Sequence, residues 1–184
     1  MKVNNVDVDR VKATAEAISA DMTKAKKVNR IEGEWNTGEG SQFRATVSFE
    51  GGEMTLEADQ PTGLGGGGTM PGPMIYCLYG SSSCYAATFA TVAASEGVTL
   101  KRLKIIAESA IDISKTFGLS ENPIAEKIKF SIDVESDAPP EKIREIEALA
   151  KQRCPAVQIP YLLRRRLSPE PDCWKLAVSG AKGP

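Results

Sequence analysis

The spacing of hydrophobic residues changes near residue 28, and the change divides the first third of the chain in two. Over residues 7–27, apolar side chains recur every three or four positions behind Asp7. This spacing predicts an amphipathic helix with Asp7 as its amino-terminal cap. We expect residues 1–27 to be a helical extension and residues 28–184 to form the main domain.

Beyond residue 28 the apolar spacing becomes two, which is typical of strands with one buried face. Residues 43–49 alternate in this way, Gly51 and Gly52 follow, and a further strand is expected over residues 54–58. The two glycines predict a tight turn, so these segments form a hairpin. The segment around residues 31–35 would extend it to a meander.

A glycine- and proline-rich segment, residues 61–73, precedes the most apolar part of the chain. It predicts a flexible loop, because glycine loses much backbone entropy in regular structure and proline lacks an N–H donor. Pro73 suits the first turn of a helix that runs to about Glu96 and stops at Gly97. This helix is apolar nearly all round, so we expect it in the middle of the core.

The second half of the chain alternates again. Apolar residues at every second position over 103–113, and again over 128–134, predict two long strands. Pro139 and Pro140 then open a predicted helix that ends at Cys154. Further closing strands are expected over 162–167 and 174–178. The order of elements predicts an α+β fold, without the regular alternation of a parallel doubly wound sheet.

Composition excludes several classes of protein. Of the 184 residues, 41% are hydrophobic, which favours one compact domain. The net charge of −1 gives no positive electrostatic field that would attract nucleic acid. There is neither a secretory signal nor a membrane-length apolar run, so a cytoplasmic location is expected. The chain has no histidine, which excludes histidine-dependent triads, bases and HExxH metal sites.

The glycine-rich segment formally contains GxGxxG at Gly63, Gly65 and Gly68. The dinucleotide fingerprint needs a strand that passes directly into a helix at these glycines, whereas four residues from Met70 to Pro73 intervene here. No P-loop lysine follows either. We therefore expect a loop over a pocket or a dimer seam, and no cofactor.

Four cysteines are the remaining candidates for chemistry: Cys77, Cys84, Cys154 and Cys173. They form no CxxC pair, so no metal site is expected. Within one helix Cys77 and Cys84 would lie about 10.5 Å apart along the axis, beyond the roughly 7 Å Cα separation that a disulfide allows. Taken singly, a cysteine in an apolar helix is usually a small hydrophobic residue.

Two sequence runs give Cys84 and Cys154 a more specific context. The run GPMIYCLYGSSSCYAATFATVAASEGV, with RCPAV about seventy residues after Cys84, resembles the OsmC/Ohr family of organic hydroperoxide reductases. The resemblance covers about residues 40–178. It implies antiparallel sheets packed around a central helix that carries Cys84, in an intertwined homodimer with active sites at the subunit interface.

The resemblance also implies roles for individual residues. Cys84 would be the peroxidatic cysteine, Cys154 the resolving cysteine, and Arg44 in QFRATV the active-site arginine. A guanidinium lowers a thiol pKa and can hold a peroxide, so the chemistry is consistent. The family places a glutamate that orients this arginine where this chain has Met74, and methionine cannot accept the arginine's hydrogen bonds. Either another carboxylate such as Glu53 or Glu57 replaces it, or the arginine is less well fixed and peroxidase activity is weaker or absent.

The leading hypothesis is therefore a peroxidase that reduces organic hydroperoxides and is regenerated by an external dithiol, which in the family is often of lipoyl type. Apolar side chains on the Cys84 helix favour organic substrates: Met74, Leu78, Tyr85 and Phe89. A second hypothesis is a non-catalytic dimer that binds a small ligand or senses redox state. A third is a structural dimer whose amino-terminal helix recruits a partner.

Overall fold

The computed structural model describes the backbone of residues 1–158 and their side chains except those of residues 125–127. The strands are β1 (Lys2–Val3), β2 (Val6–Asp7), β3 (Gly33–Trp35), β4 (Phe43–Phe49), β5 (Gly52–Ala58), β6 (Leu100–Ile111) and β7 (Ala125–Ser136). The α-helices are α1 (Val8–Ala20), α2 (Pro73–Ser95) and α3 (Pro140–Arg153), and short 3₁₀ turns lie at Met22–Ala25, Thr62–Leu64 and Lys115–Phe117.

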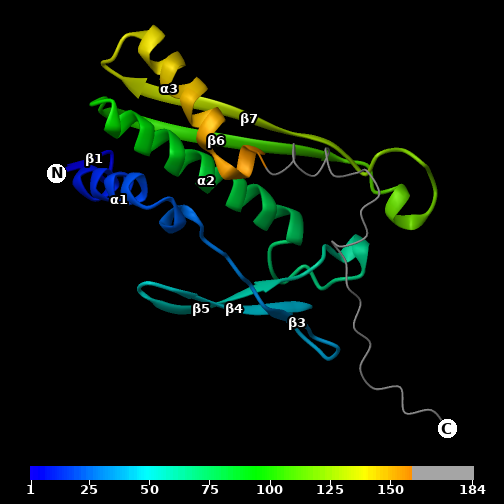
Figure 1. Ribbon diagram of the computed structural model, residues 1–184. Coiled ribbons are helices and arrows are strands. Elements are labelled where there is room, and N and C mark those ends of the chain that lie inside the picture. The colour runs from blue at the N-terminus through cyan, green and yellow to red at the C-terminus, as the bar shows by residue number, and fades with distance from the viewer. Residues whose placement is uncertain (159–184) are drawn as a thin grey trace.

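The strands form separate antiparallel sheets, which confirms the predicted α+β class. β3, β4 and β5 form a meander in that order, and β6 pairs with β7. In Figure 1, α2 runs between the β6–β7 hairpin and the β3–β4–β5 sheet, with α3 on the hairpin side. The expected strands at 162–167 and 174–178 lie outside the described residues.

Helix α2 begins and ends as predicted, but only part of it lies in a core. Pro73 occupies its first turn, and Gly97 follows its end with a φ of 72°, which glycine adopts without strain. The residues of α2 that are buried begin at Tyr85, whereas Ile75 and Tyr79 in its first half are 56% and 72% exposed. The prediction of a helix buried throughout is therefore wrong for a single chain.

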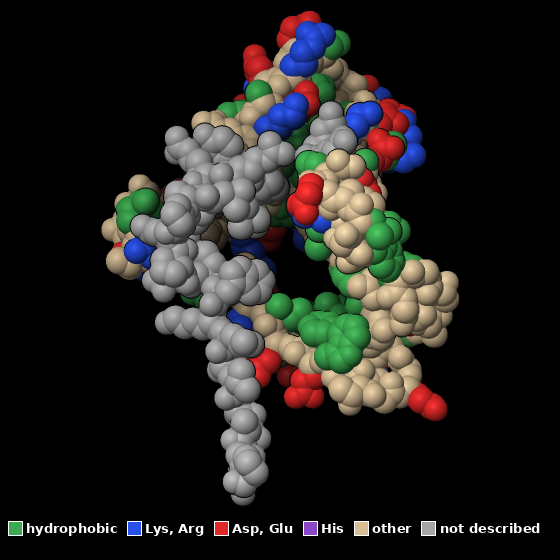
Figure 2. All heavy atoms as spheres, turned by 90° about the vertical axis from the view of Figure 1, so that its right-hand side faces the viewer, with side chains coloured by type: hydrophobic (Ala, Val, Ile, Leu, Met, Phe, Trp, Pro, Cys, Tyr) green, Lys and Arg blue, Asp and Glu red, His purple; other side chains and the backbone are tan. Residues whose placement is uncertain are grey.

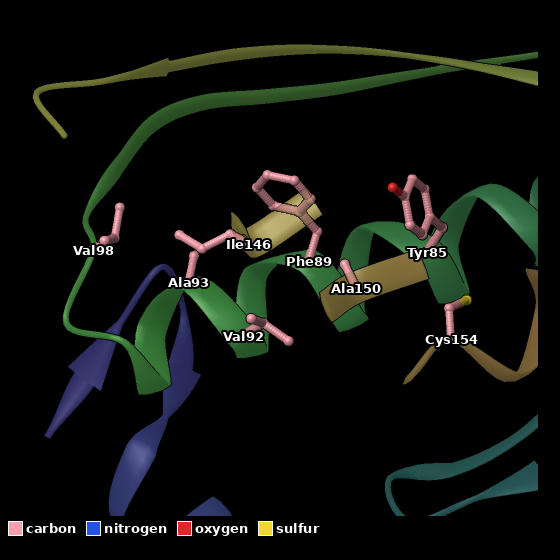
Figure 3. Close-up of a cluster of buried hydrophobic side chains, with 8 residues drawn as sticks. All are labelled: Tyr85, Phe89, Val92, Ala93, Val98, Ile146, Ala150 and Cys154. Carbon is pink, nitrogen blue, oxygen red and sulfur yellow. The ribbon is translucent and has the colours of Figure 1, made fainter. Parts of the chain in front are cut away.

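The core lies where the second half of α2 meets α3 and the β6–β7 hairpin. Its members are Tyr85, Phe89, Val92, Ala93, Val98, Ile146, Ala150 and Cys154 (Figure 3). Many large apolar side chains outside it are exposed, including Trp35, Phe49 and Met54 on the meander. Figure 2 shows hydrophobic side chains exposed on the face in view.

The amino-terminal segment differs from its prediction. Asp7 caps α1 by accepting from the Arg10 N–H, as predicted, but the helix stops at Ala20 because Asp21 is extended and accepts from the Thr23 N–H to start a new turn. Before α1, β1 and β2 form a small hairpin. Asn4 in its turn has a φ of 54°, and its side chain donates to the Val98 carbonyl and accepts from the Leu100 N–H, both at 2.8 Å.

The glycine-rich loop before α2 is built around the Asp59 carboxylate. Oδ2 of Asp59 accepts from the N–H groups of Gly67 and Thr69 and from the Thr69 hydroxyl, at 2.9–3.1 Å. These bonds, led by that from the Thr69 N–H, hold the pKa of Asp59 below its usual value. The loop thus has a defined conformation and includes a 3₁₀ turn, rather than lacking all helix as predicted.

Two glycines of this loop should differ in how well they tolerate a side chain. A Cβ on Gly66 would lie 2.0 Å from the Gln60 carbonyl oxygen, whereas a Cβ on Gly63 would have nothing within 4 Å. We expect Gly66→Ala to lower the free energy of unfolding by about 1–3 kcal/mol, and Gly63→Ala to change it little. Denaturant unfolding of both variants checks this; equal stabilities would contradict it.

Candidate functional site

The structure brings together two of the three predicted site residues. The sulfur atoms of Cys84 and Cys154 lie 3.7 Å apart, and the Cys154 thiol donates to the Cys84 sulfur. Both cysteines are free thiols. A disulfide needs its sulfur atoms at about 2.05 Å, so the pair can be oxidised after a small approach of the two side chains.

The packing of α3 on α2 creates this pair. Ile146, Ala150 and Cys154 follow one another at four-residue intervals, and each is 0% exposed. Residues four apart share one helix face, so together they form the face that α3 turns toward α2 (Figure 3). Alanine at the middle position lets the helix axes approach closely, and Cys154 therefore reaches the level of Cys84.

Cys84 is the more accessible thiol of the pair. Its side chain is partly buried, whereas Cys154 is fully buried. Burial raises the pKa of the Cys84 thiol, the backbone N–H of Ala156 opposes this by donating to the sulfur, and Cys154 raises it further. The geometry therefore suits Cys84 to meet a substrate and Cys154 to act from behind it.

Tyr85 and Phe89, which were expected to favour an organic substrate, belong to the core instead. They are 1% and 0% exposed, and the Tyr85 ring packs on Phe130 with a centroid distance of 5.8 Å. Burial raises the pKa of Tyr85 to about 12, so its hydroxyl stays protonated. Met74 is exposed and Leu78 partly exposed, and these two remain available to a ligand.

Arg44 lies elsewhere, on the β3–β4–β5 sheet. It is paired in register with Glu57 of β5, whose Oε1 accepts from its Nε at 2.7 Å and lies 2.5 Å from its Nη2. The arginine is 64% exposed and borders a surface hollow of about 400 Å³ lined also by Glu32, Gly33, Glu34 and Thr46. Among the described residues, its ion-pair partner is Glu57, and neither cysteine of its own chain contacts it.

Met74 and Glu57 bear on the glutamate that the resemblance implies beside this arginine. Met74 lies in the first turn of α2, exposed and unable to accept a hydrogen bond from a guanidinium. Glu57 supplies that acceptor, and its backbone carbonyl also accepts from the Tyr76 hydroxyl of α2 at 2.5 Å. Glu57 thus connects Arg44 to the helix that carries Cys84.

Of the other two cysteines, the structure describes one. Cys77 is exposed on α2, and Cys173 lies outside the described residues. Within residues 1–158, no group of carboxylates and cysteines is arranged to hold a metal ion. Among the helices of the same residues, none has the length and apolar character needed to cross a bilayer.

Comparison with known proteins adds the family context. A family model described as OsmC-like protein matches residues 65–159. The fold resembles the crystal structure of an OsmC-like protein from Mycoplasma pneumoniae, with a TM-score of 0.56 and 20% identity over 76% of this chain and 92% of that chain. A comparison with curated proteins gives no match.

Two further solved structures carry names that refer to hydroperoxides. The organic hydroperoxide resistance protein OsmC from Legionella pneumophila has a TM-score of 0.47 and 17% identity, over 73% of this chain and 90% of that chain. The organic hydroperoxide resistance protein of Bacillus subtilis has a TM-score of 0.45 and 16% identity, over 72% and 91%.

The exposure of the three described cysteines predicts their order of reaction. We expect iodoacetamide to modify Cys77 first, Cys84 more slowly and Cys154 slowest, with about a tenfold spread or more because a buried thiol must wait for local opening. Peptide mass spectrometry of the reduced native protein measures the rates. In urea the differences should vanish, and a Cys154 as fast as Cys77 in the native protein would contradict the structure.

Proposed function

The chain belongs to the OsmC-like protein family, and from this and its thiol pair we propose that it is a thiol-dependent peroxidase that reduces organic hydroperoxides. The observation that carries the proposal is the 3.7 Å separation of the Cys84 and Cys154 sulfur atoms. A partly exposed thiol directly in front of a buried one is the arrangement that a two-cysteine peroxidase needs.

In the proposed reaction the Cys84 thiolate attacks the outer oxygen of the hydroperoxide. The O–O bond breaks, the alcohol leaves with a proton, and Cys84 becomes a sulfenic acid. The Cys154 thiol then displaces the hydroxyl, which leaves as water, and a disulfide forms. An external dithiol, of lipoyl type or similar, reduces this disulfide by exchange and is itself oxidised.

The proposal predicts one defined product. Reduced protein treated with one equivalent of cumene hydroperoxide should lose about two daltons, the mass of two hydrogens, with Cys84 linked to Cys154 in peptide maps. In Cys154→Ser the sulfenic acid should persist and react with dimedone. Cys77→Ser is the matched control and should behave like the native protein. Absence of both the bridge and peroxide consumption would refute the proposal.

A thiol sensor of the same fold is the second candidate, and two observations favour it. Burial raises the pKa of Cys84, and no cation of the described residues contacts its sulfur in the single chain. Met74 also lacks the carboxylate that the family uses. In the same assay, a bridge that forms once but does not turn over with excess dithiol would favour the sensor.

We further propose that the working unit is a homodimer in which Arg44 acts on Cys84 of the partner subunit. The exposed apolar residues of the meander and of the first half of α2 support this, because a single chain leaves them in water. Glu57 would fix the guanidinium in place of the family glutamate, since its Oε1 contacts the Nε and Nη2 of Arg44, and a guanidinium has further N–H groups to offer a substrate.

Hybrid dimers test the exchange of Arg44. We expect Arg44→Ala and Cys84→Ser each to be inactive alone, because the first lacks the arginine and the second the nucleophile. Differently tagged chains of the two variants, co-expressed and purified as a hybrid, should recover roughly half of the native peroxidase activity, since one of the two sites is intact.

Two control variants change residues of the same chemical type, one just before the sheet and one within it. Arg30→Ala removes an exposed arginine that pairs with Glu32 and should leave activity unchanged. Glu57→Gln should lower kcat more than Glu53→Gln, which affects a glutamate bonded to Ser48 instead. An inactive hybrid with an active native dimer would show that Arg44 does not act across the interface.

A further inference from the structure

A groove lies between strand β7 and helix α3, apart from the thiol pair. One hollow of about 310 Å³ lies beside the last turn of α3, and a second of about 300 Å³ lies beside the first half of that helix. The two hollows share Phe130 and Ile132 of β7, so they form one groove. Among the described residues that line it, neither Cys84 nor Cys154 is present.

The floor of the groove is apolar. Phe130, Ile132 and Val134 line it at every second position of β7, so their side chains share one face of the strand. In Figure 3 the rings of Tyr85 and Phe89 point from α2 toward the hairpin strands, and both line the groove as well. From Phe130 to Val134 an extended strand advances about 14 Å, which is the length of the apolar floor.

Hydrogen-bond donors gather at one end of the groove, where Lys151, Gln152 and Gln158 line the same hollow as Tyr85. Nζ of Lys151 lies 2.5 Å from Oε1 of Glu147, but an ammonium group has three N–H donors and can bind a second acceptor. The side-chain amide of Gln158 donates to the Lys151 carbonyl at 3.2 Å and has a second N–H. This end therefore suits an anionic group.

The Tyr85 hydroxyl provides independent evidence for a ligand at this end. Tyr85 is 1% exposed, and among the described residues no group forms a hydrogen bond with its hydroxyl. Buried hydroxyl groups without a partner are destabilising and rare in native proteins. The ring packs on Phe130 with a centroid distance of 5.8 Å, so a small movement of the Phe130 ring gives a molecule in the groove access to the hydroxyl.

We propose that this groove binds a medium-chain aliphatic carboxylate, with its alkyl chain along β7 and its carboxylate between Tyr85 and Lys151. A straight chain of about ten carbons matches the length of the floor. The Tyr85 hydroxyl donates to one carboxylate oxygen, and the Lys151 ammonium group pairs with the same head group. Glu147 lines the other hollow and repels a carboxylate there, so it sets the direction of the ligand.

A titration of the full-length protein with decanoate, below its micelle-forming concentration, tests the inference. With ¹³C-labelled isoleucine methyl groups, Ile132 and Ile143 of the groove should shift and saturate together. Ile31 and Ile106, which are exposed elsewhere, should not shift. Decanol has no charge and should bind roughly tenfold more weakly, the effect of losing a hydrogen bond between charged groups.

Two variants test the recognition of the head group. Tyr85→Phe keeps the ring and removes the hydroxyl, and Lys151→Met removes the ammonium group; each should weaken decanoate binding roughly tenfold. The matched controls are Tyr79→Phe, at an exposed tyrosine of α2, and Lys129→Met, at an exposed lysine that pairs with a glutamate of β6. Both controls should bind decanoate like the native protein.

The absence of a saturable shift at Ile132 and Ile143 would overturn the inference, and it is the result expected if another part of the full chain or a second copy fills the groove. Unchanged affinity in both Tyr85→Phe and Lys151→Met would overturn it as well. If Tyr85→Phe does not fold, Lys151→Met decides alone, because that side chain is 58% exposed and its loss leaves the core intact. The titration contains no peroxide, so its result is independent of the proposed function.

Discussion

The contact between α2 and α3 is the constraint on which the candidate site depends. Ile146, Ala150 and Cys154 are fully buried on one face of α3, so the helix cannot rotate or slide without exposing apolar surface. The same contact sets the 3.7 Å separation of the two sulfur atoms. A core of this kind gives reactive groups a fixed position that loops rarely provide.

Burial has an electrostatic cost that the structure offsets locally. The contact that positions Cys84 also removes it partly from water, and this raises the pKa of its thiol. The backbone N–H of Ala156, two residues after Cys154, opposes this rise of the pKa in part.

The β3–β4–β5 sheet carries the Arg44–Glu57 ion pair. Arg44 and Glu57 are opposite each other on neighbouring strands, and Tyr76 connects that sheet to the start of α2. This part of the chain leaves large apolar side chains exposed, and its arginine lies away from the cysteines of its own chain. A second copy of the chain would cover those side chains and complete the site in one step, as we propose.

Local patterns in the sequence predicted most of the elements. Pro73 and Gly97 mark the ends of α2, and Asp7 caps α1. The alternation of apolar and polar residues predicted β4, β6 and β7. Caps and periodicity depend on residues that are neighbours in the sequence, so they can be recognised without the fold. The end of α1 at Ala20 was missed, since Asp21 begins a separate turn that periodicity does not report.

Distances between elements depended on the tertiary structure. The sequence suggested Cys84 and Cys154 through a family resemblance, but only the packing of α3 on α2 set their separation. The burial of the second half of α2 and the pairing of Arg44 with Glu57 likewise follow from contacts between segments far apart in the chain. A single sequence encodes such contacts only through the whole fold, whereas helix and strand patterns are local.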